Sequence, residues 1–105
     1  MGNNISLNKR DSWRTPHKVF EYFNKKYGFK LDIASSIDNH LCEKYLTEKD
    51  DALNFNVETI LEQGDYIWCN PPYSNVNPWV NKAKENKSKG FGTVMLLKND
   101  TSTKW

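Results

Sequence analysis

Two unbroken apolar runs in the C-terminal third constrain the fold of this chain most strongly. Tyr66–Cys69 and Thr93–Leu97 show no alternation of polar and apolar residues, which is typical of strands buried on both faces of a parallel sheet. Between them the sequence predicts a helix, with Asn77 as its cap, Pro78 at its first position and Gly90 at its end. A strand, a helix and a strand within about thirty residues predict a βαβ unit.

The N-terminal half predicts a further helix and a further strand. The helix begins with Thr15 as its N-cap and Pro16 at its first position, and Gly28 ends it. Residues 29–34 then form a short buried strand, which contains Asp32 and emerges at two serines. The expected fold class is therefore α/β, with a mostly parallel sheet covered by helices on both faces.

The middle of the chain is ambiguous. Residues 41–46 fit a second strand or a helical turn, whereas the pattern from Asp50 onward favours a helix start that residues 57–61 continue. Residues 1–12 are polar and lack periodicity, so we expect a disordered N-terminal segment. Residues 13–105 have the length of one domain with one core.

The composition excludes several classes of protein. The two cysteines, Cys42 and Cys69, are too few for a disulfide scaffold and lack the spacing of metal ligands. No apolar stretch approaches the length of a membrane span, and no signal peptide is visible. We therefore expect a cytosolic protein that requires neither a metal nor a membrane.

Polar residues follow the ends of three predicted strands. Asp32 lies at the exit of the first strand, Asn70–Tyr73 follow the second, and Lys98–Thr103 follow the third. In open parallel sheets, ligands bind beyond the carboxyl ends of the strands. We therefore expect these three groups to converge at one edge of the sheet.

The turn Asn70–Tyr73, with the sequence Asn-Pro-Pro-Tyr, offers the groups that make a flat conjugated amine nucleophilic. The Asn70 side-chain oxygen and the Pro71 carbonyl can each accept one amine hydrogen, which localises the nitrogen lone pair. The two prolines stiffen the turn, and the Tyr73 ring provides a face on which an extruded base stacks, worth about 1–3 kcal/mol. The alternative is that the motif is only a turn and Tyr73 packs on the core.

Asp32 and Asp51 are candidates for binding a cofactor. A carboxylate at the end of an apolar strand is costly to bury unless it meets a cation or hydrogen-bond donors. The ammonium group or the ribose hydroxyls of a cofactor would serve Asp32, but so would a helix N-terminus or a salt bridge with a lysine. Asp51 allows the same two interpretations.

The charge distribution allows a polyanionic partner without requiring one. The net charge is +2 and the sequence pI is about 8.5. Four lysines follow Pro78, namely Lys82, Lys84, Lys87 and Lys89. A solvated helix face is the simpler interpretation of such a cluster, and a nucleic-acid contact is the other.

Five motifs in order resemble the phage-type DNA N-6-adenine-methyltransferase (Dam) family. They are Trp13–Pro16, Leu31–Ala34, Asp51–Leu53, Trp68–Ser74, and Leu96–Leu97 with Thr101–Trp105. The resemblance implies a Rossmann-like fold that uses S-adenosylmethionine to methylate the exocyclic N6 amine of adenine in double-stranded DNA. It also implies a phage- or prophage-encoded protein that acts in the bacterial cytoplasm.

The resemblance implies a role for each candidate residue. The catalytic residues would be Asn70, Pro71, Pro72 and Tyr73. The cofactor-binding residues would be Thr15, Pro16, Asp32, Ala34 and Asp51. If the chain methylates DNA, we expect Lys82, Lys84, Lys87 and Lys98 to contact it, because an enzyme that extrudes a base needs contacts to the phosphates.

Two departures from the family pattern lead to further expectations. Lys98 stands where the family usually has a proline, and family members continue well beyond Trp105 with further strands. We therefore expect a domain that is incomplete at its C-terminus and whose exposed sheet edge permits self-association. Two other functions stay open: methylation of a protein glutamine amide, which the turn suits equally well, and a non-catalytic remnant that binds cofactor or DNA.

Overall fold

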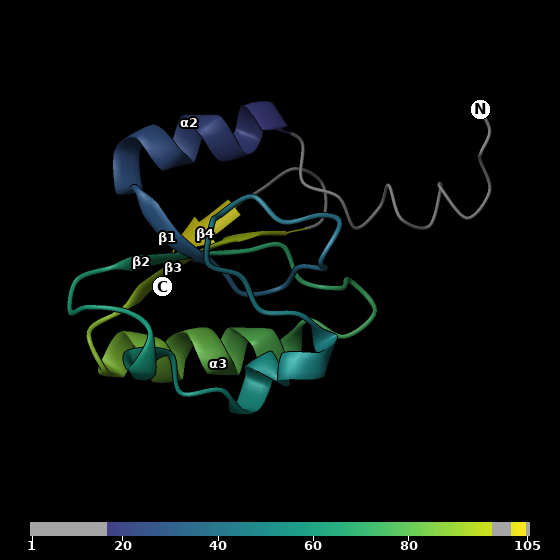
Figure 1. Cartoon of the computed structure of the whole chain (residues 1–105), viewed down its shortest axis with the longest axis vertical. Coiled ribbons are helices and arrows are strands. Elements are labelled where there is room, and N and C mark those ends of the chain that lie inside the picture. The colour runs from purple at the N-terminus through teal and green to yellow at the C-terminus, as the bar shows by residue number, and fades with distance from the viewer. Residues whose placement is uncertain (1–16, 98–101, 105) are drawn as a thin grey trace.

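The computed structural model describes residues 17–97 and 102–104, which form one four-stranded sheet with helices on both faces (Figure 1). The strands follow one another across the sheet in chain order: β1 (Phe29–Asp32), β2 (Tyr66–Cys69), β3 (Gly92–Leu96) and β4 (Ser102–Lys104). The expected α/β fold class is confirmed. Thr15, Pro16 and Lys98 lie outside the described residues, as do residues 1–12.

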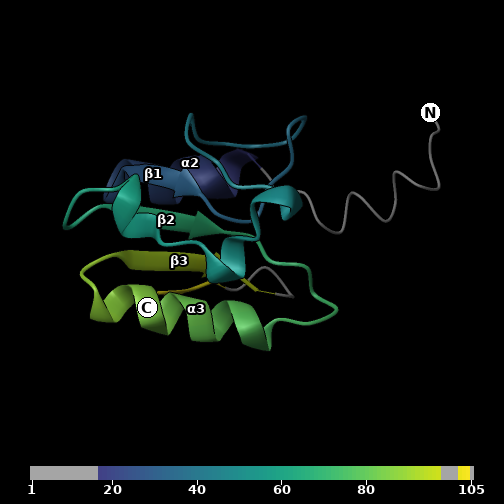
Figure 2. The ribbon, with the colours of Figure 1, turned by 60° about the horizontal axis from the view of Figure 1, so that its bottom comes forward.

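The first three strands are parallel and the fourth is antiparallel. β1 pairs with β2 and β2 pairs with β3 in parallel, so all three carboxyl ends lie at one edge of the sheet (Figure 2). β4 pairs with β3 in the antiparallel direction. The sequence predicted β1, β2 and β3 to within two residues at each end, but residues 98–103 were expected only as a polar group after the third strand, so β4 was not predicted.

The two faces of the sheet carry different helices. α2 (His17–Tyr27) covers one face, and α3 (Asn77–Ser88) covers the other (Figure 1). The core under α3 contains Leu31, Ile67 and Met95, which are 0% exposed. The core under α2 is built around Trp68, whose ring lies 5.4 Å from that of Phe20 in an edge-on contact.

Both helices end at glycines, as the sequence predicts. Gly28 has a φ of +65° and its N–H donates to the Asn24 carbonyl at 2.8 Å. Gly90 has a φ of +101°, a conformation that residues with a Cβ rarely adopt. The predicted start of α3 was wrong by one residue: Val76 is the cap, Asn77 is the first helical residue, and no side chain caps the helix.

The middle of the chain contains three short 3-10 helices in place of the expected α-helix. They are η1 (Glu48–Asp50), η2 (Ala52–Asn54) and η3 (Val57–Thr59). Asp51 separates the first two because it adopts a left-handed conformation with a φ of 52°. A helix cannot continue through a residue of this conformation, so the expectation of one helix from Asp50 was wrong.

Residues 41–46 form neither a continuous strand nor a helical turn, but they run along the outer edge of β1, where Tyr45 and Asp32 form an isolated parallel bridge. The Asp32 N–H donates to the Lys44 carbonyl at 3.1 Å, and the Leu46 N–H donates to the Asp32 carbonyl at 2.9 Å. The other outer strand, β4, has only three residues, and short edge strands discourage pairing between molecules. The structure therefore gives no support to self-association through a sheet edge.

Shortening a core side chain on β2 tests this packing. Because Ile67 is 0% exposed, Ile67→Val should lower the free energy of unfolding by about 0.5–1.5 kcal/mol in urea. Ile37→Val makes the same chemical change at a side chain that is 74% exposed, so it should change that free energy by less than about 0.5 kcal/mol. Equal effects of the two substitutions would contradict the assigned core.

Candidate functional site

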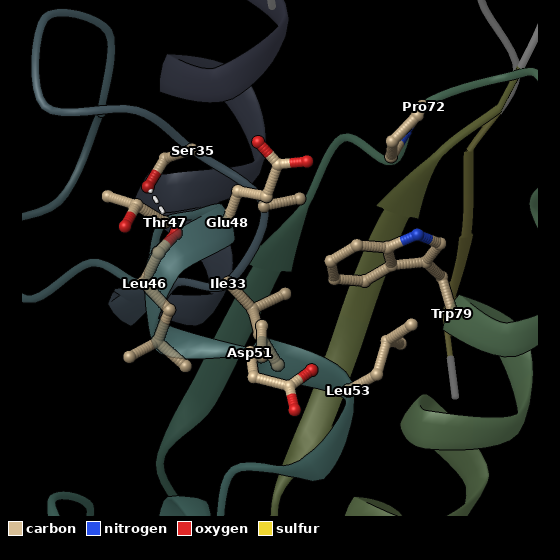
Figure 3. Close-up of a pocket in the computed structure, with 11 residues that line it drawn as sticks. Ile33, Ser35, Leu46, Thr47, Glu48, Asp51, Leu53, Pro72 and Trp79 are labelled. Carbon is tan, nitrogen blue, oxygen red and sulfur yellow. Dashed lines mark hydrogen bonds between the residues drawn. The ribbon is translucent and has the colours of Figure 1, made fainter.

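A cavity of about 240 Å³ lies beyond the carboxyl ends of β1 and β2 (Figure 3). We name it the edge cavity. Its walls come from the exit of β1, the segment of η1 and η2, the turn after β2 and the start of α3. The lining residues are Ile33, Ala34, Ser35, Leu46, Thr47, Glu48, Asp51, Ala52, Leu53, Pro72 and Trp79.

Hydrogen bonds join the exit of β1 to the segment of η1 and η2, and these two segments form most of the cavity wall. The Ser35 N–H and hydroxyl both donate to the Leu46 carbonyl, at 3.1 and 2.8 Å. Thr47 and Asp50 form a reciprocal capping pair in which the Thr47 N–H donates to Asp50 Oδ2 at 2.8 Å. These contacts fix η1 next to the end of β1 and so place Glu48 on the rim of the edge cavity.

The edge cavity combines apolar and aromatic surface with two carboxylates. Ile33 and Leu53 contribute apolar surface, and the Trp79 indole lies across the cavity from Glu48 (Figure 3). The side chains of Glu48 and Asp51 are exposed, so both carboxylates can meet a ligand. An aromatic face next to carboxylates suits a molecule with a flat ring, hydroxyl groups and positive charge.

A second hollow of about 540 Å³ adjoins the edge cavity. The two share Ser35, Thr47 and Glu48, and the second extends toward Ile37 and Tyr45. Small-molecule sites typically measure about 300–1,000 Å³, so the two hollows together have the size of a site for an extended ligand.

The turn Asn70–Tyr73 lies beside the edge cavity and lines it through Pro72. Asn70 is only 3% exposed. The Tyr73 hydroxyl lies 3.1 Å from Asn70 Oδ1 and 3.3 Å from the Leu96 carbonyl, and it is the donor to both. The turn thus connects the end of β2 to the end of β3.

Asp32 does not line the edge cavity, although Ala34 and Asp51 do. Its carboxylate is 4% exposed and accepts a hydrogen bond from the Leu41 N–H at 2.9 Å through Oδ2. Burial raises the pKa of Asp32 to about 6, and the backbone N–H groups of Leu41 and Ala34 with the nearby His40 offset part of this rise. The Asp32 carboxylate is therefore held by a backbone donor in a loop. Within the described residues it meets neither a lysine nor a helix N-terminus.

The structure contradicts the expectation that Lys82 contacts DNA. Lys82 is 4% exposed, and its ammonium group donates to the Phe55 carbonyl at 2.7 Å and to Glu85 Oε2 at 3.2 Å. It therefore joins α3 to the segment after η2 and presents no free charge to solvent. The sequence could not show this, because Phe55 lies 27 residues away along the chain.

The other described lysines of α3 are exposed, but Lys87 lies far from the turn Asn70–Tyr73. Lys87 lines a separate hollow with Tyr66, Gly92 and Lys104. Tyr66 and Gly92 are the first residues of β2 and β3, whereas Asn70 follows the last residue of β2. Lys87 is therefore at the amino edge of the sheet, opposite the edge cavity.

The sequence alone identified neither Glu48 nor Trp79 as part of a binding site. The signal for Glu48 was present, because Thr47 followed by Asp50 three residues later is the pattern of a helix N-terminus. This pattern indicates a helical turn at this position, but only the fold shows that the turn faces the end of β1.

The described residues contain no group of three or more His, Cys, Asp or Glu side chains placed to hold a metal ion. Cys42 and Cys69 are both buried and free, and burial together with the nearby Asp32 raises the pKa of Cys42 to about 12. Within residues 17–97 and 102–104, no helix is long and apolar enough to cross a membrane.

The sequence of the chain matches a protein family and several known proteins. Residues 2–105 match the family described as DNA N-6-adenine-methyltransferase (Dam). A protein of Escherichia phage T1 described as a DNA N-6-adenine-methyltransferase is 35% identical over 105 residues, which cover 99% of this chain and 42% of the relative. A protein of Haemophilus phage HP1 with the same description is 34% identical over 105 residues, which cover 97% of this chain and 58% of the relative.

A third relative is described as putative methyltransferase YfdM of Escherichia coli K12. It is 38% identical over 71 residues, which cover 66% of this chain and 74% of the relative. The chain spans about half the length of the two phage relatives. No solved structure matches it.

The raised pKa of Asp32 predicts a pH dependence of stability. The folded state holds the Asp32 proton more tightly than the unfolded chain does, because the pKa of this carboxyl is about 6 in the folded state and 3.8 in the unfolded chain. The stabilisation from this proton is complete below pH 3.8 and is lost as the pH rises through about 6. The loss should be on the order of 3 kcal/mol.

Asp32→Asn keeps the shape and the acceptor for Leu41 but removes the titration. The free energy of unfolding in urea, measured from pH 4 to pH 7, should rise for the variant relative to the wild type as the pH increases. A difference between the two proteins that stays constant over this range would show that Asp32 titrates normally.

Proposed function

Because the chain belongs to the DNA N-6-adenine-methyltransferase (Dam) family, we propose that it transfers a methyl group from S-adenosylmethionine to the N6 amine of adenine in double-stranded DNA. The observation that carries this proposal is the position of the turn Asn70–Tyr73. The turn lies at the carboxyl end of β2, beside a cavity with carboxylates on its rim. A base held by the turn and a cofactor held in the cavity would lie next to each other.

The residues of the edge cavity fit S-adenosylmethionine, which when bound supplies an electrophilic methyl group on a positively charged sulfur. Trp79 and Ile33 offer surface on which an adenine ring packs. Glu48 and Asp51 can accept hydrogen bonds from ribose hydroxyls or from an ammonium group, and their charge is opposite to that of the cofactor.

Asp32 acts in this proposal by positioning the cavity wall and does not contact the cofactor directly. Its carboxylate holds the Leu41 N–H, and its backbone holds Lys44 and Leu46. These bonds keep the segment after β1, which includes Ala34, against the segment that leads to η1. The roles of Thr15 and Pro16 at the cofactor rest on the family resemblance alone.

The turn prepares the adenine amine for methylation. Asn70 Oδ1 and the Pro71 carbonyl accept the two amine hydrogens, so the nitrogen lone pair points away from the ring and toward the methyl donor. Pro71 and Pro72 hold these acceptors in a fixed geometry, which reduces the reorganisation needed during the reaction. The Tyr73 ring stacks on the extruded base.

DNA contacts on α3 are more limited in this proposal than the sequence suggested. Lys82 is excluded because its charge is buried and paired. Lys87 lies at the amino edge of the sheet. Lys84 is exposed and stays a candidate for a phosphate contact, and Lys98 stays one on the basis of its place in the sequence.

Replacing Asn70 tests the role of the turn. Asn70→Ala should lower the transfer of labelled methyl groups to unmethylated duplex DNA by about 100- to 1,000-fold, because one preorganised acceptor is lost. The affinity for S-adenosylmethionine, measured by calorimetry, should change less than about twofold. Asn75→Ala is the matched control, because Asn75 is an exposed asparagine five residues along the same segment.

Wild-type transfer by Asn70→Ala would contradict the assignment of Asn70. Label in a protein translation factor and not in DNA would indicate the glutamine amide as the substrate. Label in neither, with the cofactor still bound, would indicate a non-catalytic binding protein.

Replacing the rim carboxylates tests the cofactor site. Glu48→Gln and Asp51→Asn should each weaken S-adenosylmethionine binding by about 5- to 50-fold in calorimetry, since a charged acceptor becomes neutral. Glu62→Gln, at an exposed carboxylate outside the edge cavity, should leave the affinity unchanged. Equal affinities for all three variants and the wild type would exclude the edge cavity as the cofactor site.

A further inference from the structure

The Tyr73 hydroxyl contacts the side-chain oxygen that the proposed reaction needs. Asn70 Oδ1 is the acceptor assigned to one hydrogen of the adenine amine, and the Tyr73 hydroxyl lies 3.1 Å from it as a donor. The same hydroxyl lies 3.3 Å from the Leu96 carbonyl. Its single hydrogen is therefore shared between an acceptor on the turn and an acceptor at the end of β3.

The residues around Asn70 Oδ1 leave little of it open to solvent. Asn70 is 3% exposed and Pro71 is buried, so solvent barely reaches the turn at this point. A base amine that donates to Oδ1 must lie within about 3 Å of it. The Tyr73 hydroxyl already lies near that shell, at 3.1 Å. Because Asn70 is almost completely buried, little room remains there for a base amine beside the hydroxyl.

We propose that the Tyr73 hydroxyl closes the base-binding site by occupying Asn70 Oδ1, and that an extruded adenine opens the site by replacing it. This inference rests on the proposed function, since it assumes that Asn70 receives an adenine amine. Tyr73 thus has two positions. In the first its hydroxyl satisfies the buried oxygen, and in the second its ring stacks on the base.

The Leu96 carbonyl explains how the hydroxyl can leave without losing every partner. A hydroxyl that donates to two acceptors at 3.1 and 3.3 Å binds neither at the shortest distance of O–H···O hydrogen bonds. A small rotation of the side chain can therefore give the hydrogen to Leu96 and withdraw it from Asn70 Oδ1. The contact is strong enough to satisfy a buried acceptor and weak enough for a base amine to displace it.

The competing explanation is that the hydroxyl orients Asn70 for catalysis and remains bound to it throughout the reaction. The two accounts predict opposite effects of removing the hydroxyl. If the hydroxyl closes the site, its removal lowers the cost of base entry and tightens binding. If it orients Asn70, its removal slows methyl transfer and leaves binding unchanged.

The experiment compares Tyr73→Phe with the wild type and with Tyr66→Phe, which removes a hydroxyl at the opposite edge of the sheet. The methylated sequence is first mapped with the wild-type chain. Affinity is then measured by fluorescence anisotropy for a duplex with that sequence and for one without it, and kcat and KM are measured with the first duplex. Circular dichroism verifies that each variant is folded.

For Tyr73→Phe we expect the Kd and the KM of the target duplex to fall by about three- to tenfold, the range that loss of one neutral hydrogen bond gives. The Kd of the other duplex and the kcat should stay within twofold of the wild type, as should every value for Tyr66→Phe. A lower kcat with an unchanged Kd, or no change in either, would overturn the proposal while leaving the proposed function intact. A wild-type chain that methylates no duplex would overturn the proposed function itself.

The 13C resonance of the Tyr73 ring carbon that bears the hydroxyl gives a second test in the wild-type chain. Addition of the target duplex should shift this resonance, because the hydroxyl changes its hydrogen-bond partner, whereas the same carbon of Tyr66 should not shift. An unshifted Tyr73 resonance with bound target duplex would also overturn the proposal.

Discussion

The parallel pairing of β2 with both β1 and β3 is the constraint on which the rest of this structure depends. It brings the carboxyl ends of three strands to one edge of the sheet. More than thirty residues of chain separate β1 from β2, and α3 lies between β2 and β3. Each strand then delivers a different group to that edge: Asp32 from β1, the turn Asn70–Tyr73 from β2 and the Leu96 carbonyl from β3. An antiparallel pairing would place these groups at opposite edges.

The two edges of the sheet differ in charge, and this difference is consistent with the proposed ligands. At the carboxyl edge, the carboxylates of Glu48 and Asp51 lie on the rim of the edge cavity, which favours a cationic ligand. At the amino edge, Lys87 and Lys104 line another hollow, and the Lys104 ammonium lies 5.4 Å from the centre of the Tyr66 ring. In the proposed reaction the acidic rim would repel DNA phosphates, so an extruded base would reach the turn Asn70–Tyr73 from the side away from Glu48.

The sequence predicted those parts of the fold whose causes are local. An unbroken apolar run identifies β2, and glycines with left-handed φ values identify the ends of α2 and α3. The turn Asn70–Tyr73 was placed correctly, because a rigid turn directly follows a buried strand. The sequence did not predict β4 or the burial of Lys82, since each depends on a partner in another element, β3 for the strand and Phe55 for the lysine. It did not predict the 3-10 helices, because the left-handed conformation of Asp51 has no clear signature in the sequence. Glu48 was missed for the same reason: its position follows from contacts between Ser35 and Leu46.

The central claim is that one edge of this sheet holds an adenine and a methyl donor side by side. The most direct measurement is mass spectrometry of nucleosides from unmethylated duplex DNA that has been incubated with the purified chain and S-adenosylmethionine carrying a deuterated methyl group. The account predicts N6-methyladenine with the full deuterium label, and about 100- to 1,000-fold less of it with Asn70→Ala. Unlabelled adenine after incubation with a folded chain that binds the cofactor would contradict it.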